Sequence, residues 1–165
     1  MKIGGKVLLI GAALALSACA GQDGMFGGGS ENGATAAGAV SDPRSPAYFQ
    51  QTVGDRVLFP VDESTLTTDA QQLVSAQAAW LMDNGSFSAV IEGHADEQGT
   101  REYNLALGAR RASAVRDYLV NQGVADSRLK TITYGKERPL EICSEESCYT
   151  KNRRAVTVLS AGPTS

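Results

Sequence analysis

Residues 93–100 read Gly93-His94-Ala95-Asp96-Glu97-Gln98-Gly99-Thr100 and lead into a helical pattern that contains Ala109-Arg110-Arg111-Ala112. At 100° per residue, one face of that helix is apolar and consists of Tyr103, Leu107, Ala114, Val115, Tyr118 and Leu119. Arg111 falls near the middle of this face, and Asn104 lies beside it. Because a guanidinium stays charged and is costly to bury alone, it needs acceptors. The sequence therefore predicts either a structural carboxylate or a ligand against this face.

Outward from this segment, the chain alternates between strand and helix patterns. Strands are expected at 56–59, 87–92, 129–134 and 154–160, and helices at 68–84 and 101–121. Thr68 and Asp69 suit a helix start, and Gly123 suits the C-terminal cap of the longer helix. This order predicts a small βαβαββ sandwich with helices on one face of a sheet.

The N-terminus has the pattern of an export signal. Two lysines precede an apolar run at 7–16 that is too short to span a bilayer comfortably. The run closes with Leu16-Ser17-Ala18-Cys19, which resembles the lipobox of bacterial lipoproteins, and an ordinary secretory signal is the alternative. We expect a signal peptide over residues 1–18 and lipidation of Cys19. By the same resemblance, Ala20 implies sorting to the outer membrane.

Composition separates a tether from a folded domain. Residues 21–40 are rich in glycine, alanine and serine, so residues 19–47 are expected to form a flexible tether. Residues 48–165 are expected to form one domain. The formal net charge is −3, and loss of the signal lysines makes it more negative. This balance argues against nucleic acid as a partner.

Two further cysteines, Cys143 and Cys148, lie five residues apart. In an exported chain they can close a small loop as a disulfide, and two buried thiols are the alternative. A zinc site is disfavoured, because there is no second cysteine pair and His94 is the single histidine. We expect the disulfide, and neither a metal nor a cofactor.

Residues 91–112, which read IEGHADEQGTREYNLALGARRA, resemble the signature of the OmpA-like peptidoglycan-binding domain. Asn152-Arg153-Arg154-Ala155-Val156 resembles the motif of its last strand. The resemblance covers about residues 55–160. It implies the α+β fold of that domain, a mixed sheet with helices on one face, and binding of the diaminopimelate in the peptidoglycan stem peptide.

The resemblance also implies which residues bind that ligand: Asp96, Arg111, Asn104, Leu107, Phe59 and Asp62. The free end of diaminopimelate carries an ammonium and a carboxylate on one carbon, so an aspartate and an arginine are its complement. From the residues alone, Asp96 and Arg111 could equally form a structural ion pair. Pro60 departs from the family pattern and removes one backbone N–H from the loop after the first strand.

Other charged and aromatic residues are interpreted as structural. Arg110, Arg153 and Arg154 are expected to be surface or strand-edge charges. Tyr103, Tyr118 and Trp80 are expected in the core. His94 and Asp96 could belong to a catalytic or metal site, but the sequence has no further ligand cluster to support this reading.

With the lipobox and the tether, the resemblance implies a non-enzymatic lipoprotein that ties the outer membrane to the cell wall, with its domain in the periplasm. It further implies the Tol proteins, TolB among them, as partners, and a part in cell division. One alternative is a peptidoglycan anchor of another envelope machine, such as a secretion system. A peptidoglycan hydrolase is the second alternative.

Overall fold

The structure is a computed structural model, and it describes residues 38–161. The expected signal peptide, Cys19 and most of the expected tether lie outside the described residues. The helices are α1 (Pro46–Tyr48), which continues as a π-helical segment over Phe49–Gly54, α2 (Thr68–Asp83), α3 (Arg101–Asn121), a 3-10 turn over Asp126–Arg128, and α4 (Glu146–Asn152). The strands are β1 (Arg56–Leu58), β2 (Phe87–His94), β3 (Leu129–Gly135) and β4 (Arg154–Ala161). Within residues 38–161, no helix is both long and apolar enough to cross a membrane.

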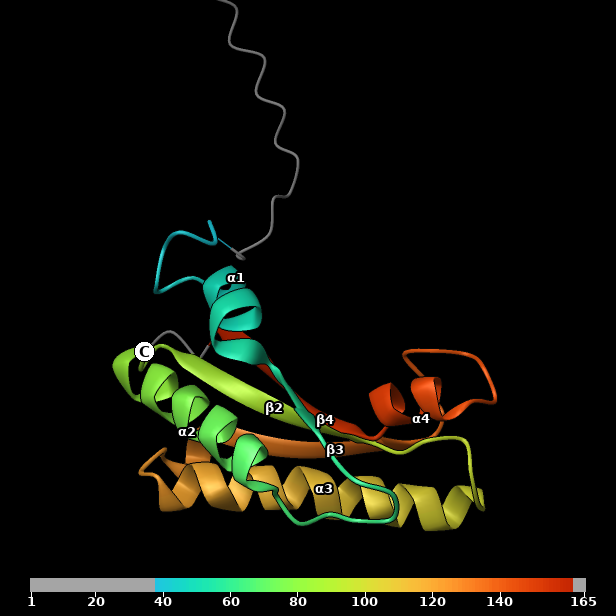
Figure 1. The fold of residues 1–165 in the computed structure, drawn as a ribbon. Coiled ribbons are helices and arrows are strands. Elements are labelled where there is room, and N and C mark those ends of the chain that lie inside the picture. The colour runs from blue at the N-terminus through green and yellow to red at the C-terminus, as the bar shows by residue number, and fades with distance from the viewer. Residues whose placement is uncertain (1–37, 162–165) are drawn as a thin grey trace, which may run out of the picture. The chain divides into compact units, whose positions relative to one another are not determined.

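The strands form a mixed four-stranded sheet in the order β1-β4-β2-β3. β4 pairs antiparallel with both β1 and β2, whereas β2 and β3 are parallel. Parallel neighbours need a crossover connection, and α3 supplies it. Figure 1 shows α2 and α3 on the same side of the sheet, with α3 running along β3. The predicted α+β fold with a mixed sheet is confirmed.

The close packing of α3 on β2 depends on two glycines. A Cβ atom on Gly93 would lie 1.8 Å from the carbonyl oxygen of Gly108, and one on Gly108 would lie 2.9 Å from the carbonyl oxygen of Gly93. The two backbones therefore touch without intervening side chains, as only glycine permits. This contact fixes the end of β2, where the chain enters the loop at 95–100.

Two helical segments were not expected from the sequence. The first is α1 with its π-helical continuation, in which Ser45 caps the helix and Phe49 is fully buried. The Trp80 Nε1 atom donates to the Pro43 carbonyl oxygen at 2.7 Å, so a residue assigned above to the tether contacts the folded part. The second segment is α4, whose first residues lie within the ring closed by the cysteines.

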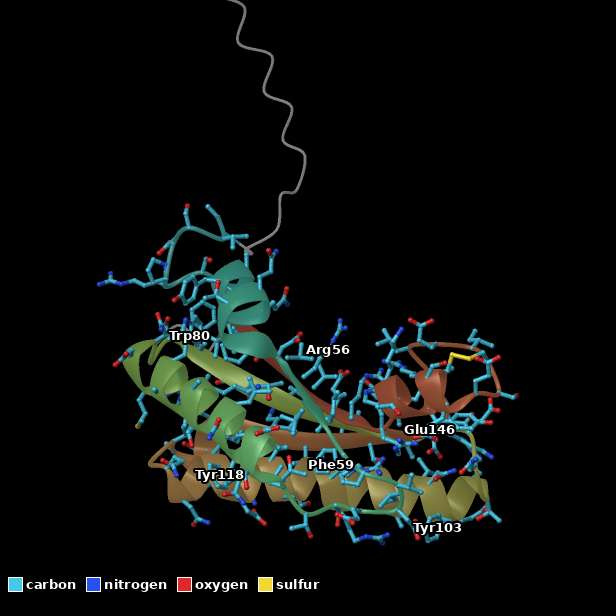
Figure 2. All side chains as sticks on the ribbon, in the orientation of Figure 1. Arg56, Phe59, Trp80, Tyr103, Tyr118 and Glu146 are labelled. Atoms are coloured by element: carbon cyan, nitrogen blue, oxygen red, sulfur yellow. A yellow bond between two sulfur atoms is a disulfide. The ribbon has the colours of Figure 1, made fainter. Side chains whose placement is uncertain are left out.

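Cys143 and Cys148 form a disulfide, as the sequence predicts. Figure 2 shows it as the yellow bond beside the loop that leads into α4. Cys148 is buried and lies within α4, while Cys143 is half-buried in the loop before it. The bond therefore connects a loop to a helix of only seven residues.

Candidate functional site

A cavity of about 380 Å³ opens at the end of β2, beside the first turns of α3. It is lined by Val61, Asp62, Asp96, Gln98, Gly99, Tyr103, Asn104 and Leu107. Four of the six predicted site residues are in this group: Asp62, Asp96, Asn104 and Leu107. They come from the loop after β1, the loop after β2 and the helix α3. The structure thus brings together residues that lie more than 40 positions apart in the chain.

Hydrogen bonds within the loop at 95–100 fix the position of Asp96. Its Oδ1 atom accepts from the Gln98 amide at 3.2 Å, and the Asn104 Nδ2 atom donates to the Gln98 carbonyl oxygen at 2.7 Å. Thr100 then caps α3 by accepting from the Tyr103 amide at 3.2 Å. Gly99 has a φ of +89°, a conformation that favours glycine. Asp96 is consequently held at the wall of the cavity with little freedom.

Arg111 does not line the cavity, since its side chain is completely buried. Its guanidinium donates to three backbone carbonyl oxygens, those of Glu63 and His94 at 2.8 Å and that of Pro60 at 3.1 Å. The hydrogen bonds of this guanidinium are therefore accepted by backbone carbonyl oxygens, and not by the carboxylate or ligand that the sequence predicts. Pro60 contributes its carbonyl oxygen here, although it lacks the N–H considered above.

The charge of Arg111 nevertheless acts close to the cavity. Burial lowers the pKa of Arg111 to about 10, while the negative charges of Asp96 and Asp62 oppose that decrease. The guanidinium therefore stays protonated at neutral pH. It lies 5.2 Å from the centre of the Phe59 ring, within cation–π range.

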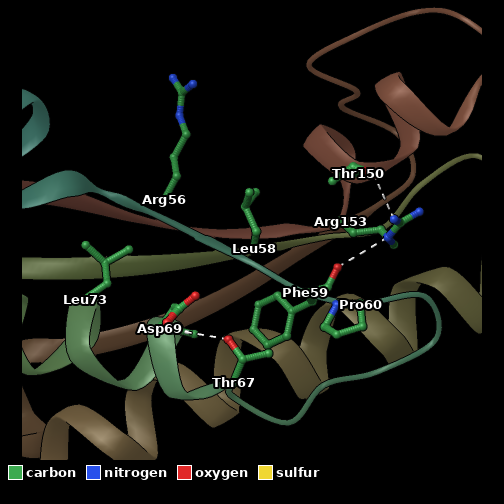
Figure 3. Close-up of a pocket in the computed structure, with 10 residues that line it drawn as sticks. Arg56, Leu58, Phe59, Pro60, Thr67, Asp69, Leu73, Thr150 and Arg153 are labelled. Atoms are coloured by element: carbon green, nitrogen blue, oxygen red, sulfur yellow. Dashed lines mark hydrogen bonds between the residues drawn. The ribbon is translucent and has the colours of Figure 1, made fainter.

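Phe59, the other predicted residue that does not line this cavity, is buried at 3% exposure. It borders a second cavity of about 460 Å³ that also contains Arg153 and Thr150 (Figure 3). Its carbonyl oxygen accepts from the Arg153 Nε atom at 3.3 Å. Phe59 thus packs behind the first cavity and contacts Arg111 and Arg153.

The direct charged partner of Asp96 is Arg153, which sequence reasoning assigned to the surface or a strand edge. That prediction is wrong, because Arg153 is only 4% exposed. Its Nη1 atom lies 3.2 Å from Asp96 Oδ2, and its Nη2 atom forms an ion pair with Glu146 of α4. The signal that could have identified it is its place in the Asn152-Arg153-Arg154 motif.

The neighbouring arginines differ from one another. Arg154 is also buried, at 7% exposure, and donates to the carbonyl oxygens of Asn152 and Arg138. Arg154 is therefore not a surface charge, but its place as the first residue of β4 and its bonds to backbone carbonyls agree with the expected structural role. Arg110, in contrast, is exposed as expected and lies 6.0 Å from the centre of the Tyr103 ring.

Tyr103 was expected in the core, and this prediction is also wrong. Its side chain is 42% exposed and lines the cavity, where its hydroxyl donates to Asp62. That hydrogen bond raises the pKa of Tyr103. Trp80 is buried as expected, whereas Tyr118 packs at the edge of the core with its hydroxyl 3.2 Å from Ser75 Oγ.

Glu97 connects the site loop to the segment that carries the disulfide. Its Oε1 atom accepts from Ser144 Oγ at 2.8 Å and from the Tyr149 hydroxyl at 3.0 Å. Lys136 donates to the carbonyl oxygens of Glu97 and Gly99, at 3.3 Å and 2.6 Å. The loop at 95–100 is therefore positioned by contacts with Lys136, Ser144 and Tyr149 as well as by the hydrogen bonds described above.

His94 lies behind the site and does not line the cavity. It is 2% exposed, and burial together with the positive charges of Arg154 and Arg138 lowers its pKa to about 4. The imidazole is consequently neutral at pH 7. Its ring lies 5.5 Å from that of Tyr134, so it packs as part of the interior.

The fold and the site define a class of small α+β domain that presents a cavity with two carboxylates at the end of a central strand. The chain belongs to the OmpA family, whose model matches residues 58–153.

Similar proteins carry a consistent name. The chain is 50% identical over 153 residues to the peptidoglycan-associated lipoprotein of Agrobacterium fabrum, a match that covers 93% of this chain and 86% of that protein. It is 52% identical over 149 residues to the protein of the same name from Mesorhizobium japonicum, covering 90% of this chain and 88% of the relative. The crystal structure of the peptidoglycan-associated lipoprotein from Burkholderia pseudomallei matches with a TM-score of 0.65 and 36% identity, covering 73% of this chain and 98% of that one.

Proposed function

We propose that this chain binds peptidoglycan noncovalently, through the diaminopimelate of the stem peptide, in the cavity lined by Asp96. The observation that carries the proposal is the convergence of Asp62, Asp96, Asn104 and Leu107 on one cavity. The names of the relatives support the same ligand class.

The chemistry of the cavity suits a zwitterionic ligand end. Asp96 and Asp62 offer carboxylates for the ligand's ammonium, and Asn104 and Tyr103 add polar groups next to the apolar side chain of Leu107. Arg153 is buried beside Asp96, and the charge of buried Arg111 acts on both Asp96 and Asp62. We propose that their positive charges favour the ligand's carboxylate through the electrostatic field, while Asp96 pairs with the ammonium.

The wider proposal concerns the whole chain. Lipidated Cys19 would anchor the chain in the outer membrane, the glycine-rich tether would span the gap, and the domain in the periplasm would hold the cell wall without enzymatic activity. Several acyl chains give stable anchoring, whereas one alone is marginal. We propose the Tol proteins, including TolB, as partners, and a part in envelope integrity and cell division.

The ligand site is tested by sedimentation of the full chain, purified in detergent, with isolated sacculi. We expect wild-type protein to sediment and Asp96→Asn to remain largely in the supernatant. Asp117→Asn is the matched control, because it makes the same change at an exposed position of α3. Asp96→Asn protein that is folded and sediments like the wild type would contradict the site.

Competition identifies the ligand more narrowly. A stem peptide that contains diaminopimelate is expected to release the protein from sacculi, whereas the same peptide with lysine in its place is expected to be much weaker. Within the peptide, the lysine side chain carries the ammonium but lacks the carboxylate on that carbon, so the difference measures recognition of the zwitterion. Equal competition by both would reject it.

Three other measurements test the remaining parts. Cys19→Ala should abolish acyl labelling. Co-purification from detergent-solubilised envelopes should recover Tol proteins, and recovery of a secretion machine instead would favour the first alternative. Release of soluble dye from labelled sacculi would favour a hydrolase.

A further inference from the structure

The ring closed by Cys143 and Cys148 reaches the candidate site through two of its own side chains. Ser144 donates to Glu97 at 2.8 Å, and Glu146 forms an ion pair with Arg153. Both residues lie between the two cysteines in sequence. The loop that carries Asp96 is therefore contacted twice from inside the disulfide ring, at Glu97 and, through Arg153, at Asp96.

Arg153 transmits the second of these contacts. One side of its guanidinium is held by α4, through Glu146 and through Thr150 Oγ1 at 3.1 Å, and Figure 3 shows Thr150 beside it. The other side donates to Asp96 Oδ2 at 3.2 Å. If α4 moved, Arg153 would lose its partner Glu146 and would have Asp96 as its remaining charged partner. The carboxylate would then be more fully neutralised and less available to a ligand's ammonium.

The disulfide adds a covalent link to the exposed part of this segment. Asn152 fastens the start of the loop, since its side chain binds the amides of Leu140 and Glu141 and the Glu141 carbonyl oxygen. Residues 144–147, in contrast, are exposed. A helix of seven residues such as α4 is marginal on its own, so a covalent connection at Cys148 contributes to its position.

We propose that the Cys143–Cys148 disulfide positions Asp96 and Glu97, so that the site binds its ligand more tightly in the disulfide form than in the dithiol form. The part of this inference that concerns ligand affinity rests on the proposed function. The part that concerns the positions of Asp96 and Glu97 does not. Cys143 and Cys148 are positioning residues, since neither lines the cavity.

The redox step needs a dithiol reductant. Its thiolate attacks the sulfur of half-buried Cys143, the S–S bond breaks, and Cys148 leaves as a thiolate that takes up a proton. The second thiol of the reductant then displaces Cys143, which is released as a thiol. Two electrons and two protons pass to the cysteines, and the reductant becomes a disulfide.

The test compares the oxidised full chain with the same protein after reduction by dithiothreitol, using sacculus sedimentation over a range of sacculus concentrations. We expect reduction to weaken binding about fivefold, the effect of losing one hydrogen bond of ordinary net strength. The double variant Cys143→Ser/Cys148→Ser should match the reduced protein and should not respond to dithiothreitol. Ser144→Ala, which leaves the disulfide intact, should reproduce part of the loss in the oxidised state.

A second readout does not depend on the ligand. The Gln98 amide donates to Asp96 Oδ1, so its hydrogen exchange reports the order of the site loop. We expect this amide to exchange faster in the reduced protein, while amides in the centre of β2 keep their rates. Equal binding and equal Gln98 exchange in both redox states would overturn the inference. If oxidised protein fails to bind sacculi, the proposed function fails, and Gln98 exchange still decides whether the disulfide orders the loop.

Discussion

On one side of the cavity, α3 and β2 meet backbone to backbone, whereas on the other side the segment closed by the disulfide reaches the site loop through polar and charged side chains. We call the first the helix side, which comprises Gly93, Gly108 and Arg111, and the second the disulfide side, which comprises residues 143–153. The helix side uses close packing and carbonyl acceptors, and neither can be altered without disturbing the core. The disulfide side contains more exposed residues and is held by ion pairs and a disulfide.

The difference between buried Arg111 and buried Arg153 shows what each side does. Arg111 fastens the carbonyl oxygens of Pro60, Glu63 and His94, and so connects the loop after β1 to the end of β2. Arg153 is held between two carboxylates, one of which lines the cavity. We infer that changes on the helix side mainly affect stability and that changes on the disulfide side mainly affect affinity.

The largest effect is expected from Gly93→Ala. The added methyl group would overlap the Gly108 carbonyl oxygen, so β2 and α3 would have to separate. We expect a loss of more than about 4 kcal/mol in the free energy of unfolding, or no stable fold at all. Urea unfolding followed by circular dichroism measures it.

The matched control is Gly85→Ala, because a Cβ atom there meets nothing within 4 Å. This variant should stay within about 0.5 kcal/mol of the wild type. A Gly93→Ala protein with a wild-type urea midpoint would show that the helix side is not closely packed.

The next largest effect is expected from Arg111→Ala. The change leaves three carbonyl oxygens without their donor and opens a cavity in the interior, so the unfolding free energy should fall by at least about 3 kcal/mol. Arg110→Ala makes the same substitution one residue earlier at an exposed position, and should change stability little. If Arg111→Ala lost ligand binding at unchanged stability, Arg111 would contact the ligand directly and the contrast between the two sides would fail.

The two sides of the cavity differ in how far their structure can be predicted from the sequence. The pattern of residues 87–121 predicts β2 and α3 almost to the residue, because periodicity and caps are local signals. The acceptors of Arg111 could not be predicted, since every residue has a carbonyl and two of the three lie about 50 positions away. The burial of Arg153 depends on α4, whose seven residues are too few to show a helical period. The disulfide was predictable because cysteine spacing in an exported chain is a strong constraint.

Tyr103 shows a limit of helix-wheel reasoning. It shares the apolar face of α3 with Leu107, but it lies near the helix N-terminus, lines the cavity and is 42% exposed. Periodicity gives the face of a residue but not how far the sheet extends over that face. A residue near a helix end can therefore line a site although its position in the pattern predicts the core.

A pH titration should separate the contribution of His94, at the end of β2, from that of Glu146 on the disulfide side. In the folded protein, burial and the charges of Arg154 and Arg138 lower the pKa of His94 from its ordinary value of 6.5 to about 4. Glu92 lies 3.8 Å from the His94 Nε2 atom. The contribution of neutral His94 to the free energy of unfolding is fully present above pH 6.5 and is lost as the pH falls from 6.5 to about 4. The loss should reach about 3 kcal/mol. Urea unfolding at several pH values measures it.

His94→Gln should remove most of this dependence, because the replacement side chain does not titrate. The pKa of Glu146 is lowered by hydrogen bonds from Arg153 and Thr150, so its contribution is lost only as the pH falls below 4.5. The contribution of His94 should therefore be lost before that of Glu146 on acidification. If the unfolding free energy of His94→Gln fell between pH 6.5 and 4.5 as steeply as that of the wild type, a group other than His94 would cause the pH dependence.

The smallest effect is expected from Glu146→Gln, which removes one charge from the disulfide side while keeping the size of the side chain. Arg153 would then have Asp96 as its remaining carboxylate partner, and a ligand's ammonium would meet a more neutralised site. Sedimentation with sacculi should show binding weakened about twofold to fivefold, the range of a partly exposed ion pair, with the urea midpoint unchanged. Glu145→Gln, at the adjacent exposed position, should leave both measurements as in the wild type. A Glu146→Gln protein that loses stability but keeps its affinity would reverse the assignment, because the disulfide side would then support the fold and not the ligand.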